Sequence, residues 1–181
     1  MPEETIWSKF FDPEHILQQM EVTHDLKSIV DLGCGFGTFS IPASQIVKGT
    51  VHAFDIDQEM IRQLQSKIDQ LELNNIELHL KDFITEGSGL ADNSIDYVML
   101  FNILHHDNPH QILNEVLRIL KAGCKAGIIH WRSDIPTPRG PQLDIRSTPD
   151  QCKQWAVESG FSICKDLIIE PFHFGIIISK L

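Results

Sequence analysis

Short and long apolar patterns alternate along the chain and predict a mixed α/β fold. The short patterns are nearly continuous apolar runs, as in buried strands, and the long ones repeat an apolar residue every three or four positions, as in amphipathic helices. The recurring order of strand, helix and strand predicts parallel strands joined by right-handed crossovers. The strands are expected at 29–32, 50–55, 76–80, 95–101, 125–131, 163–169 and 174–179.

Capping residues, proline and glycine mark the ends of the expected helices. Asp12 and Pro13 begin one helix, Asn108 and Pro109 begin another, and Gly123 is expected to end the second. The last two strands have no helix between them, which predicts an antiparallel pair. The pattern therefore predicts a doubly wound, seven-stranded sheet with an antiparallel C-terminal strand pair. The helices are expected at 13–20, 38–47, 57–73, 109–122 and 148–160.

Three alternating glycines follow the first expected strand. Gly33, Gly35 and Gly37 come directly after an apolar run that contains Asp31. Because glycine allows a tight turn and a close approach of a ligand to the backbone, this turn predicts a nucleotide-type cofactor site. A dinucleotide fingerprint has a further glycine where this chain has Thr38. The acid at Asp31 suits a ligand with an amine or a sulfonium better than a phosphate ligand.

The stretch 31–37, Asp-Leu-Gly-Cys-Gly-Phe-Gly, resembles the first motif of class I S-adenosylmethionine-dependent methyltransferases. Residues 94–98 resemble the turn of that family into its fourth strand. Residues 115–123 resemble its Glu-x-x-Arg-x-Leu-Lys-Pro-Gly-Gly stretch, with Ala122 and Cys124 replacing the proline and the second glycine. The chain is similar to the methyltransferase type 11 branch, which includes ubiquinone-biosynthesis-like enzymes. The resemblance implies a Rossmann-like fold and S-adenosyl-L-methionine as cofactor. A nicotinamide-dependent oxidoreductase and a non-catalytic, cofactor-binding partner subunit are the alternatives.

Three expected strands end in or are followed by an acid, at Asp31, Asp55 and Asp82. The resemblance implies that Asp55 holds the ribose hydroxyls, and that Asp82 meets the adenine amine with Phe83 beside it. Asp57 is expected to cap a helix. The implied cofactor-binding residues are Asp31, Gly33, Gly35, Gly37, Asp55, Ile56, Asp82, Phe83 and Asn102.

The resemblance implies an in-line methyl transfer with a neutral leaving group, so the protein mainly supplies alignment. A base is needed only where the acceptor starts protonated, and histidine titrates near neutral pH. Four histidines follow strand ends, at His105, His106, His130 and His173, and each also suits a capping or buried role. We select His106 and His130 as the catalytic candidates. A metal cluster within 105–110 is disfavoured because adjacent histidines seldom share a metal, so no metal is expected.

Charge and composition narrow the class of substrate. The net charge is −10 and the 15 basic residues are scattered, which disfavours a nucleic-acid partner. The sequence Asn-Ile-Leu-His at 102–105 lacks the Asp/Asn-Pro-Pro-Tyr/Phe motif of enzymes that methylate nucleic-acid amino groups, and no cysteine nucleophile lies near that strand. We therefore expect a small-molecule substrate. Three arginines in the segment 132–147 could either clamp an acidic group of the substrate or lie in a solvated linker: Arg132, Arg139 and Arg146.

The chain of 181 residues is expected to form one domain. We divide it into an N-terminal cap segment (1–27), a cofactor-binding core (28–131), a substrate-side loop (132–147) and a C-terminal helix and hairpin (148–181). The cap segment is expected either to fold over the cofactor as a lid or to cover the sheet edge. The four cysteines lack metal spacing, and no signal peptide or membrane span is apparent, so we expect a cytoplasmic protein without a membrane partner. The oligomeric state is open, with a homodimer among the options.

Overall fold

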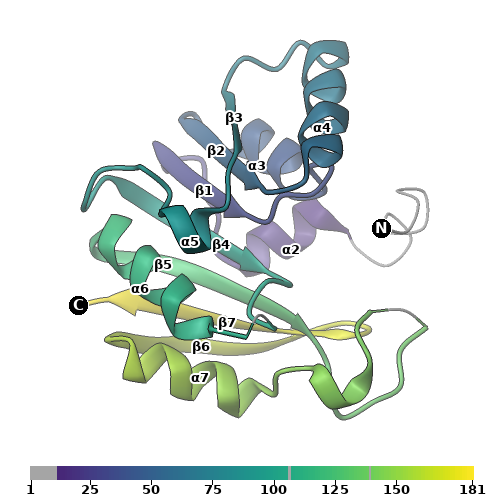
Figure 1. Ribbon diagram of the computed structural model, residues 1–181, viewed down its shortest axis with the longest axis vertical. Coiled ribbons are helices and arrows are strands. Elements are labelled where there is room, and N and C mark those ends of the chain that lie inside the picture. Colours follow the sequence, from purple (N-terminus) through teal and green to yellow (C-terminus); the bar gives the residue numbers. More distant parts are fainter. Residues whose placement is uncertain (1–11, 106, 139) are drawn as a thin grey trace.

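A single seven-stranded sheet organises the computed structural model, which describes residues 12–105, 107–138 and 140–181 (Figure 1). The strand order is β3-β2-β1-β4-β5-β7-β6. The first five strands are parallel, whereas β7 runs antiparallel to both β5 and β6. This confirms the doubly wound sheet and its antiparallel terminal pair. The strands are β1 (Ser28–Leu32), β2 (Thr50–Asp55), β3 (Ile76–Leu80), β4 (Ile95–Phe101), β5 (Leu120–Trp131), β6 (Phe161–Ile169) and β7 (His173–Lys180).

Helices cover both faces of the sheet (Figure 1). One face carries α2, α3 and α4, and the other carries α5, α6 and α7. No helix among the described residues is long and apolar enough to cross a membrane. The helices are α2 (Pro13–Gln19), α3 (Ser40–Ile46), α4 (Gln58–Gln70), α5 (Phe83–Glu86), α6 (Pro109–Ile119) and α7 (Pro149–Glu158), with a 3₁₀ turn, η1, at Leu143–Ile145.

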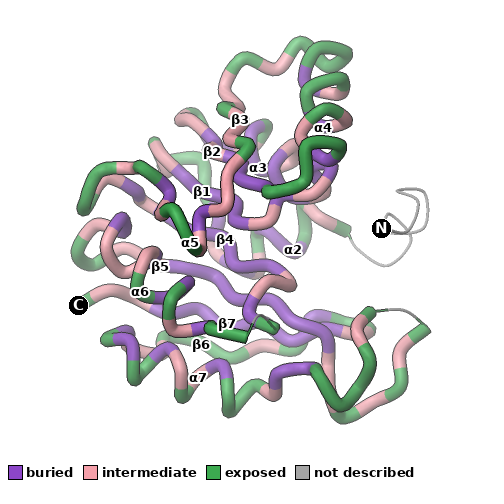
Figure 2. The backbone as a smooth tube through the Cα atoms, viewed as in Figure 1, coloured by how far each residue is buried: buried purple, intermediate pink, exposed green. Residues whose placement is uncertain are grey.

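The core lies on both sides of the central strands (Figure 2). Alternate residues of a strand point to opposite faces, so Ile29 of β1 joins the α2 and α3 side while Val30 joins the α6 and α7 side. Both side chains are fully buried. This two-sided burial explains why the central strands appear in the sequence as continuous apolar runs.

Helix α2 packs on the sheet. Its side chains Ile16 and Leu17 are buried in the core, and the hydroxyl of Tyr97 in β4 donates to the carbonyl of Met20 at 2.6 Å. The described part of the N-terminal segment therefore covers the sheet. Residues 1–11, which complete the expected lid, lie outside the described residues.

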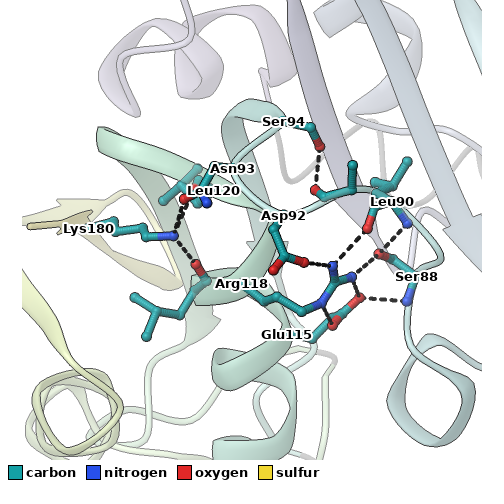
Figure 3. A network of polar contacts seen from close by, with 11 residues as sticks. Ser88, Leu90, Asp92, Asn93, Ser94, Glu115, Arg118, Leu120 and Lys180 are labelled. Carbon is teal, nitrogen blue, oxygen red and sulfur yellow. Dashed lines mark hydrogen bonds and ion pairs between the residues drawn. The ribbon is translucent and has the colours of Figure 1, made fainter.

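The boundary between α6 and β5 corrects the sequence analysis. The prediction that Gly123 ends the helix is wrong, because α6 ends at Ile119 and β5 already begins at Leu120. Lys180 of β7 donates from Nζ to the carbonyls of Leu117 and Leu120, at 2.6 and 2.8 Å (Figure 3). Free carbonyls at a helix end need such donors, and this one comes from a distant strand. Gly123, at φ 75°, lies in β5 near the irregularity in its pairing with β4.

The Glu-x-x-Arg stretch of α6 fastens the loop that precedes β4 (Figure 3). Glu115 accepts from the backbone N–H of Ser88 at 2.6 Å and from Arg118 at 2.7 and 2.8 Å. Arg118 also donates to the carbonyl of Leu90 at 2.8 Å and pairs with Asp92. The Arg118 guanidinium lowers the pKa of Glu115 to about 2, so Glu115 stays ionised and keeps these hydrogen bonds at neutral pH. These residues therefore serve the fold and position β4.

Candidate active site

The turn after β1 has the backbone conformation that its glycines require. Gly33 and Gly37 have backbone φ values of 78° and 86°, which residues with a Cβ rarely adopt. A Cβ on Gly33 would approach the side chain of Ile103 to 3.0 Å, and one on Gly37 would overlap Leu64 of α4. The amide groups of Gly33 and Cys34 donate to the carbonyl of Phe54 at 2.9 Å, which joins this turn to the end of β2.

Asp55 at the end of β2 is held by two backbone amides. Its Oδ2 accepts from the N–H of Gly35 at 2.8 Å and its Oδ1 from that of Asp57 at 2.9 Å. The side chain is almost buried yet lines the cavity described below. Each carboxylate oxygen keeps a further lone pair for a ligand. Asp57 accepts from Glu59 N–H as the cap of α4, which confirms the capping role expected of that acid.

Asp31 lies beneath the turn, in the core of the sheet. Ser40 donates to its carboxylate at 2.5 Å, and only 3% of the residue is exposed. Burial raises the pKa of Asp31 to about 6, against the opposing hydrogen bond from Ser40, and the Asp55 carboxylate adds to the rise. Asp31 is absent from the cavity lining, so its charge would act on a ligand through the turn and not by a described contact.

Asp82 follows β3 and caps α5. Its carboxylate accepts from the N–H groups of Ile84 and Thr85 at 3.1 and 3.3 Å and from the Thr85 hydroxyl at 2.7 Å. It nevertheless lines the cavity together with Phe83. The cap orients the acid, because the helix start fixes the position of its side chain.

A cavity of about 630 Å³ collects nearly all the implied cofactor residues at the carboxyl ends of the strands. Its volume lies in the usual range for small-molecule and cofactor sites. Ile56, which is exposed, and Phe83, which is buried, supply apolar surface next to two acids. Of the implied set, Gly33, Gly35, Asp55, Ile56, Asp82, Phe83 and Asn102 line the cavity, whereas Asp31 and Gly37 support it from behind.

Asn102, directly after β4, carries a buried polar atom without a hydrogen-bond partner in the described structure. Its φ is 58°, and its backbone N–H donates to the carbonyl of Ile129 at 2.7 Å. Its side-chain Oδ1 is buried and has no hydrogen-bond partner in the described structure. A buried acceptor without a donor is costly, so a ligand amine at this wall of the cavity would satisfy it.

The candidate histidines occupy very different places. His106 lies outside the described residues. His130 is fully buried, is absent from the described lining of both cavities, and burial lowers its pKa to about 4. His105 is exposed and lines two cavities, and its ring meets that of His130 edge to face at 5.5 Å. His173, also buried, has its pKa lowered to about 3 by burial. The structure therefore brings His105, a candidate that the sequence analysis weighed but did not select, to the cavity.

A second cavity, of about 450 Å³, lies under the segment that follows β5. Its lining includes Leu104, His105, Trp155 and the residues from 143 to 148. Sequence analysis named the segment 132–147 as the substrate side but did not foresee Trp155 of α7 in this lining. Trp131, which directly precedes the segment, lines the first cavity.

Arg146 fastens this segment. Its guanidinium donates to the carbonyls of Pro141 and Arg132 at 2.8 and 2.7 Å and to the hydroxyl of Thr137 at 2.6 Å, and it lies 5.6 Å from the Trp131 ring. The residue is 7% exposed. Arg132 instead pairs with Asp134. Arg146 is thus neither a solvated linker residue nor an open clamp, and Arg139 lies outside the described residues.

The family comparison agrees with this geometry. Residues 29–123, more than half of the chain, match the family described as Methyltransferase domain, and the chain belongs to that family. Its fold and site define it as a class I S-adenosylmethionine-dependent methyltransferase of the type 11 kind. The cofactor of this class, S-adenosyl-L-methionine, fits the residues present: a glycine cradle that a Cβ would fill, two acids and an unpartnered buried acceptor at Asn102.

Two solved structures show the same fold over nearly the whole chain. A SAM-dependent methyltransferase from Aquifex aeolicus is 23% identical with a TM-score of 0.87, and the match covers 96% of this chain and 92% of that one. A type 11 methyltransferase from Sulfolobus solfataricus is 26% identical with a TM-score of 0.75, covering 94% and 92%.

Curated relatives match over shorter stretches. The demethylmenaquinone methyltransferase of Listeria welshimeri is 28% identical over 109 residues, which are 56% of this chain and 44% of that protein. The rRNA N(6)-adenosine-methyltransferase METTL5 of Danio rerio is 35% identical over 65 residues, 36% of this chain and 31% of that protein. The chain thus spans less than half the length of these relatives.

Proposed function

We propose that this chain transfers a methyl group from S-adenosylmethionine to a small-molecule acceptor. The observation that carries the proposal is the position of His105, which lines both the cofactor cavity and the second cavity. An acceptor in the second cavity would then lie next to the cofactor, with His105 at the boundary of the two cavities, and methyl transfer depends on the acceptor atom reaching the methyl group directly. The second cavity has the size of a small-molecule pocket.

S-adenosylmethionine supplies a methyl group on a positively charged sulfur, and the acceptor takes this methyl group by displacing the sulfur with its lone pair. The residues of this chain bind and orient the reactants. We assign Asp55 to the ribose hydroxyls, Asp82 with Phe83 and Ile56 to the adenine, and Asn102 to the ligand amine. We keep His106 as a proposed general base. We add His105 as a second proposed base, because His105 lines both cavities. His130 is proposed to act through the ring of His105 as a positioning residue.

A nucleic-acid acceptor is the second candidate, because one relative is named as an rRNA methyltransferase. The Asn-Ile-Leu-His sequence at 102–105 and the net charge of −10 favour the small molecule instead, as does the relative named for demethylmenaquinone. A cofactor-binding partner subunit without its own turnover is the remaining alternative.

The test is transfer of tritiated methyl groups from S-adenosylmethionine to separate acceptor pools. We expect label in a small-molecule pool that includes quinols, and we expect it to fall in His105→Phe while S-adenosylhomocysteine binding is retained. Label in purified rRNA alone would overturn the small-molecule assignment. Binding of S-adenosylhomocysteine without labelling of either pool would instead support the partner subunit.

A further inference from the structure

Three side chains with metal-binding atoms lie together on β2 and β3, the two neighbouring strands at one edge of the sheet, away from both cavities. His52 of β2 pairs directly with Glu77 of the edge strand β3, and His79 lies two residues further along β3. The intervening Leu78 packs toward α4, so Glu77 and His79 point to the opposite face. The strand register therefore brings all three side chains to one face of the sheet.

The distances between these atoms suit a metal better than a network of hydrogen bonds. Nδ1 of His52 lies 3.4 Å from Nε2 of His79 and 3.2 Å from Oε2 of Glu77. Three such ligand atoms all lie within 4.8 Å of one another. Ligands at zinc bond lengths in a tetrahedral site are about 3.3 Å apart. One ring nitrogen carries at most one hydrogen, so Nδ1 of His52 cannot donate to both neighbours.

The surroundings hold the rings in place and leave one side open. The His79 ring stacks on Phe54, with centroids 4.2 Å apart and planes 10° apart, which fixes its orientation. The His52 side chain is 14% exposed and that of Glu77 is 60% exposed. Burial lowers the pKa of both imidazoles. Lys81 is the cation that acts on His79 and opposes a metal there.

We propose that His52, Glu77 and His79 form a binding site for Zn²⁺, with solvent completing its coordination. Two imidazoles and one carboxylate are ligands that zinc accepts, and an open fourth position is compatible with the exposed side of the cluster. Bound metal links β3 to β2. Because Asp82 and Phe83 follow β3 directly, the metal secures the strand that presents them to the cofactor cavity.

The test is titration of the chelator-treated protein with Zn²⁺ against a chromophoric competitor, followed by cobalt spectroscopy. We expect one equivalent to bind, with affinity at least tenfold lower in Glu77→Gln and in His52→Gln. His24→Gln is the matched control, because His24 pairs with the single acid Asp25 at an exposed turn and should leave binding unchanged. Zinc should also raise the melting temperature of the wild type but not of Glu77→Gln.

Two further measurements distinguish this site from a cysteine-bound metal and from a folding defect of the variant. The visible spectrum of the Co²⁺ form should lack a thiolate charge-transfer band, because no cysteine belongs to the cluster. Binding of S-adenosylhomocysteine by Glu77→Gln verifies that the variant folds. Absence of zinc binding, wild-type affinity in both cluster variants, or a thiolate band would overturn the metal site and would leave the methyltransferase assignment untouched.

Discussion

The two halves of the sheet build their parts of the site by different means. In the half formed by β1, β2 and β3, short turns carry the functional groups, and backbone amides hold them, as Gly35 and Asp57 hold the carboxylate of Asp55. In the half formed by β4 to β7, a long irregular segment covers the site, and side-chain contacts hold it, those of Arg146 foremost among the described residues. The first arrangement depends on the fold itself, and the second on a few side-chain contacts.

This difference fits a division between a cofactor common to a family and an acceptor particular to one protein. Backbone-held groups change little when surface residues change, whereas a loop held by a few side-chain contacts can change its sequence and length with little effect on the sheet. We therefore expect that a substitution in one half leaves the structure and the ligand binding of the other half unchanged. The following predictions test that independence.

The largest effect is expected for Asp55→Ala. We propose that the carboxylate accepts hydrogen bonds from the ribose hydroxyls, and it also holds the turn at Gly35, so affinity for S-adenosylhomocysteine should fall by about 100-fold. Isothermal titration measures it, with NADH as a parallel ligand that we expect not to bind. Asp57→Asn is the control, because it keeps the helix cap and should bind as the wild type does. Equal affinity in Asp55→Ala would remove Asp55 from the site.

Breaking the tie in the other half should have a local effect. Arg146→Met removes donors to the carbonyls of Pro141 and Arg132, which should cost about 2 kcal/mol of stability and expose the segment 132–148 to protease. Limited proteolysis and denaturant unfolding measure these changes. Arg132→Met, which removes only an exposed pair with Asp134, serves as the control. A large loss of S-adenosylhomocysteine affinity in Arg146→Met would show that the halves are not independent.

The sequence predicted the first half well because its signals are local. Alternating glycines, an acid at the end of an apolar run and a proline after a capping residue each depend on neighbouring positions, and Asp12 caps α2 ahead of Pro13 as expected. The doubly wound sheet followed from these local patterns, and seven of the nine residues that the family resemblance implied line the cofactor cavity.

The second half was harder because its determinants are distant in sequence. The start of β5 depends on Lys180, some 60 residues away, and the course of the loop depends on contacts of Arg146. One feature of the first half is equally non-local: the cluster of His52 with Glu77 and His79 arises from the register of β2 and β3, which no single stretch of sequence displays. Sequence analysis considered metal binding at 105–110, where adjacent histidines drew attention, and at the four cysteines, but not at these two strands.

Asp31→Asn should separate stability from binding within the first half. Because burial raises the pKa of Asp31 to about 6, the folded protein binds this proton more tightly than the unfolded chain does, and stability falls as pH rises from about 4 to 6. Asparagine carries no such penalty. We expect a gain of about 1–2 kcal/mol at pH 8 that disappears near pH 4, measured by urea unfolding. Ser40→Ala, which removes the hydroxyl donor, should instead destabilise at pH 8.

The same acid predicts a smaller dependence of cofactor affinity on pH. Below pH 6 the Asp31 carboxylate gains a proton and loses the charge that we expect to attract the ammonium group of the ligand. About one tenth of the carboxylate stays ionised one unit below its pKa, so affinity for S-adenosylhomocysteine should fall about tenfold from pH 7 to pH 5. Titration in buffers of different ionisation enthalpy should show proton release near pH 6, and Asp31→Asn should show neither effect. A flat profile in the wild type would mean that Asp31 supports the turn without acting on the ligand, and the proposed cofactor contacts would then be those of Asp55, Asp82 and Asn102.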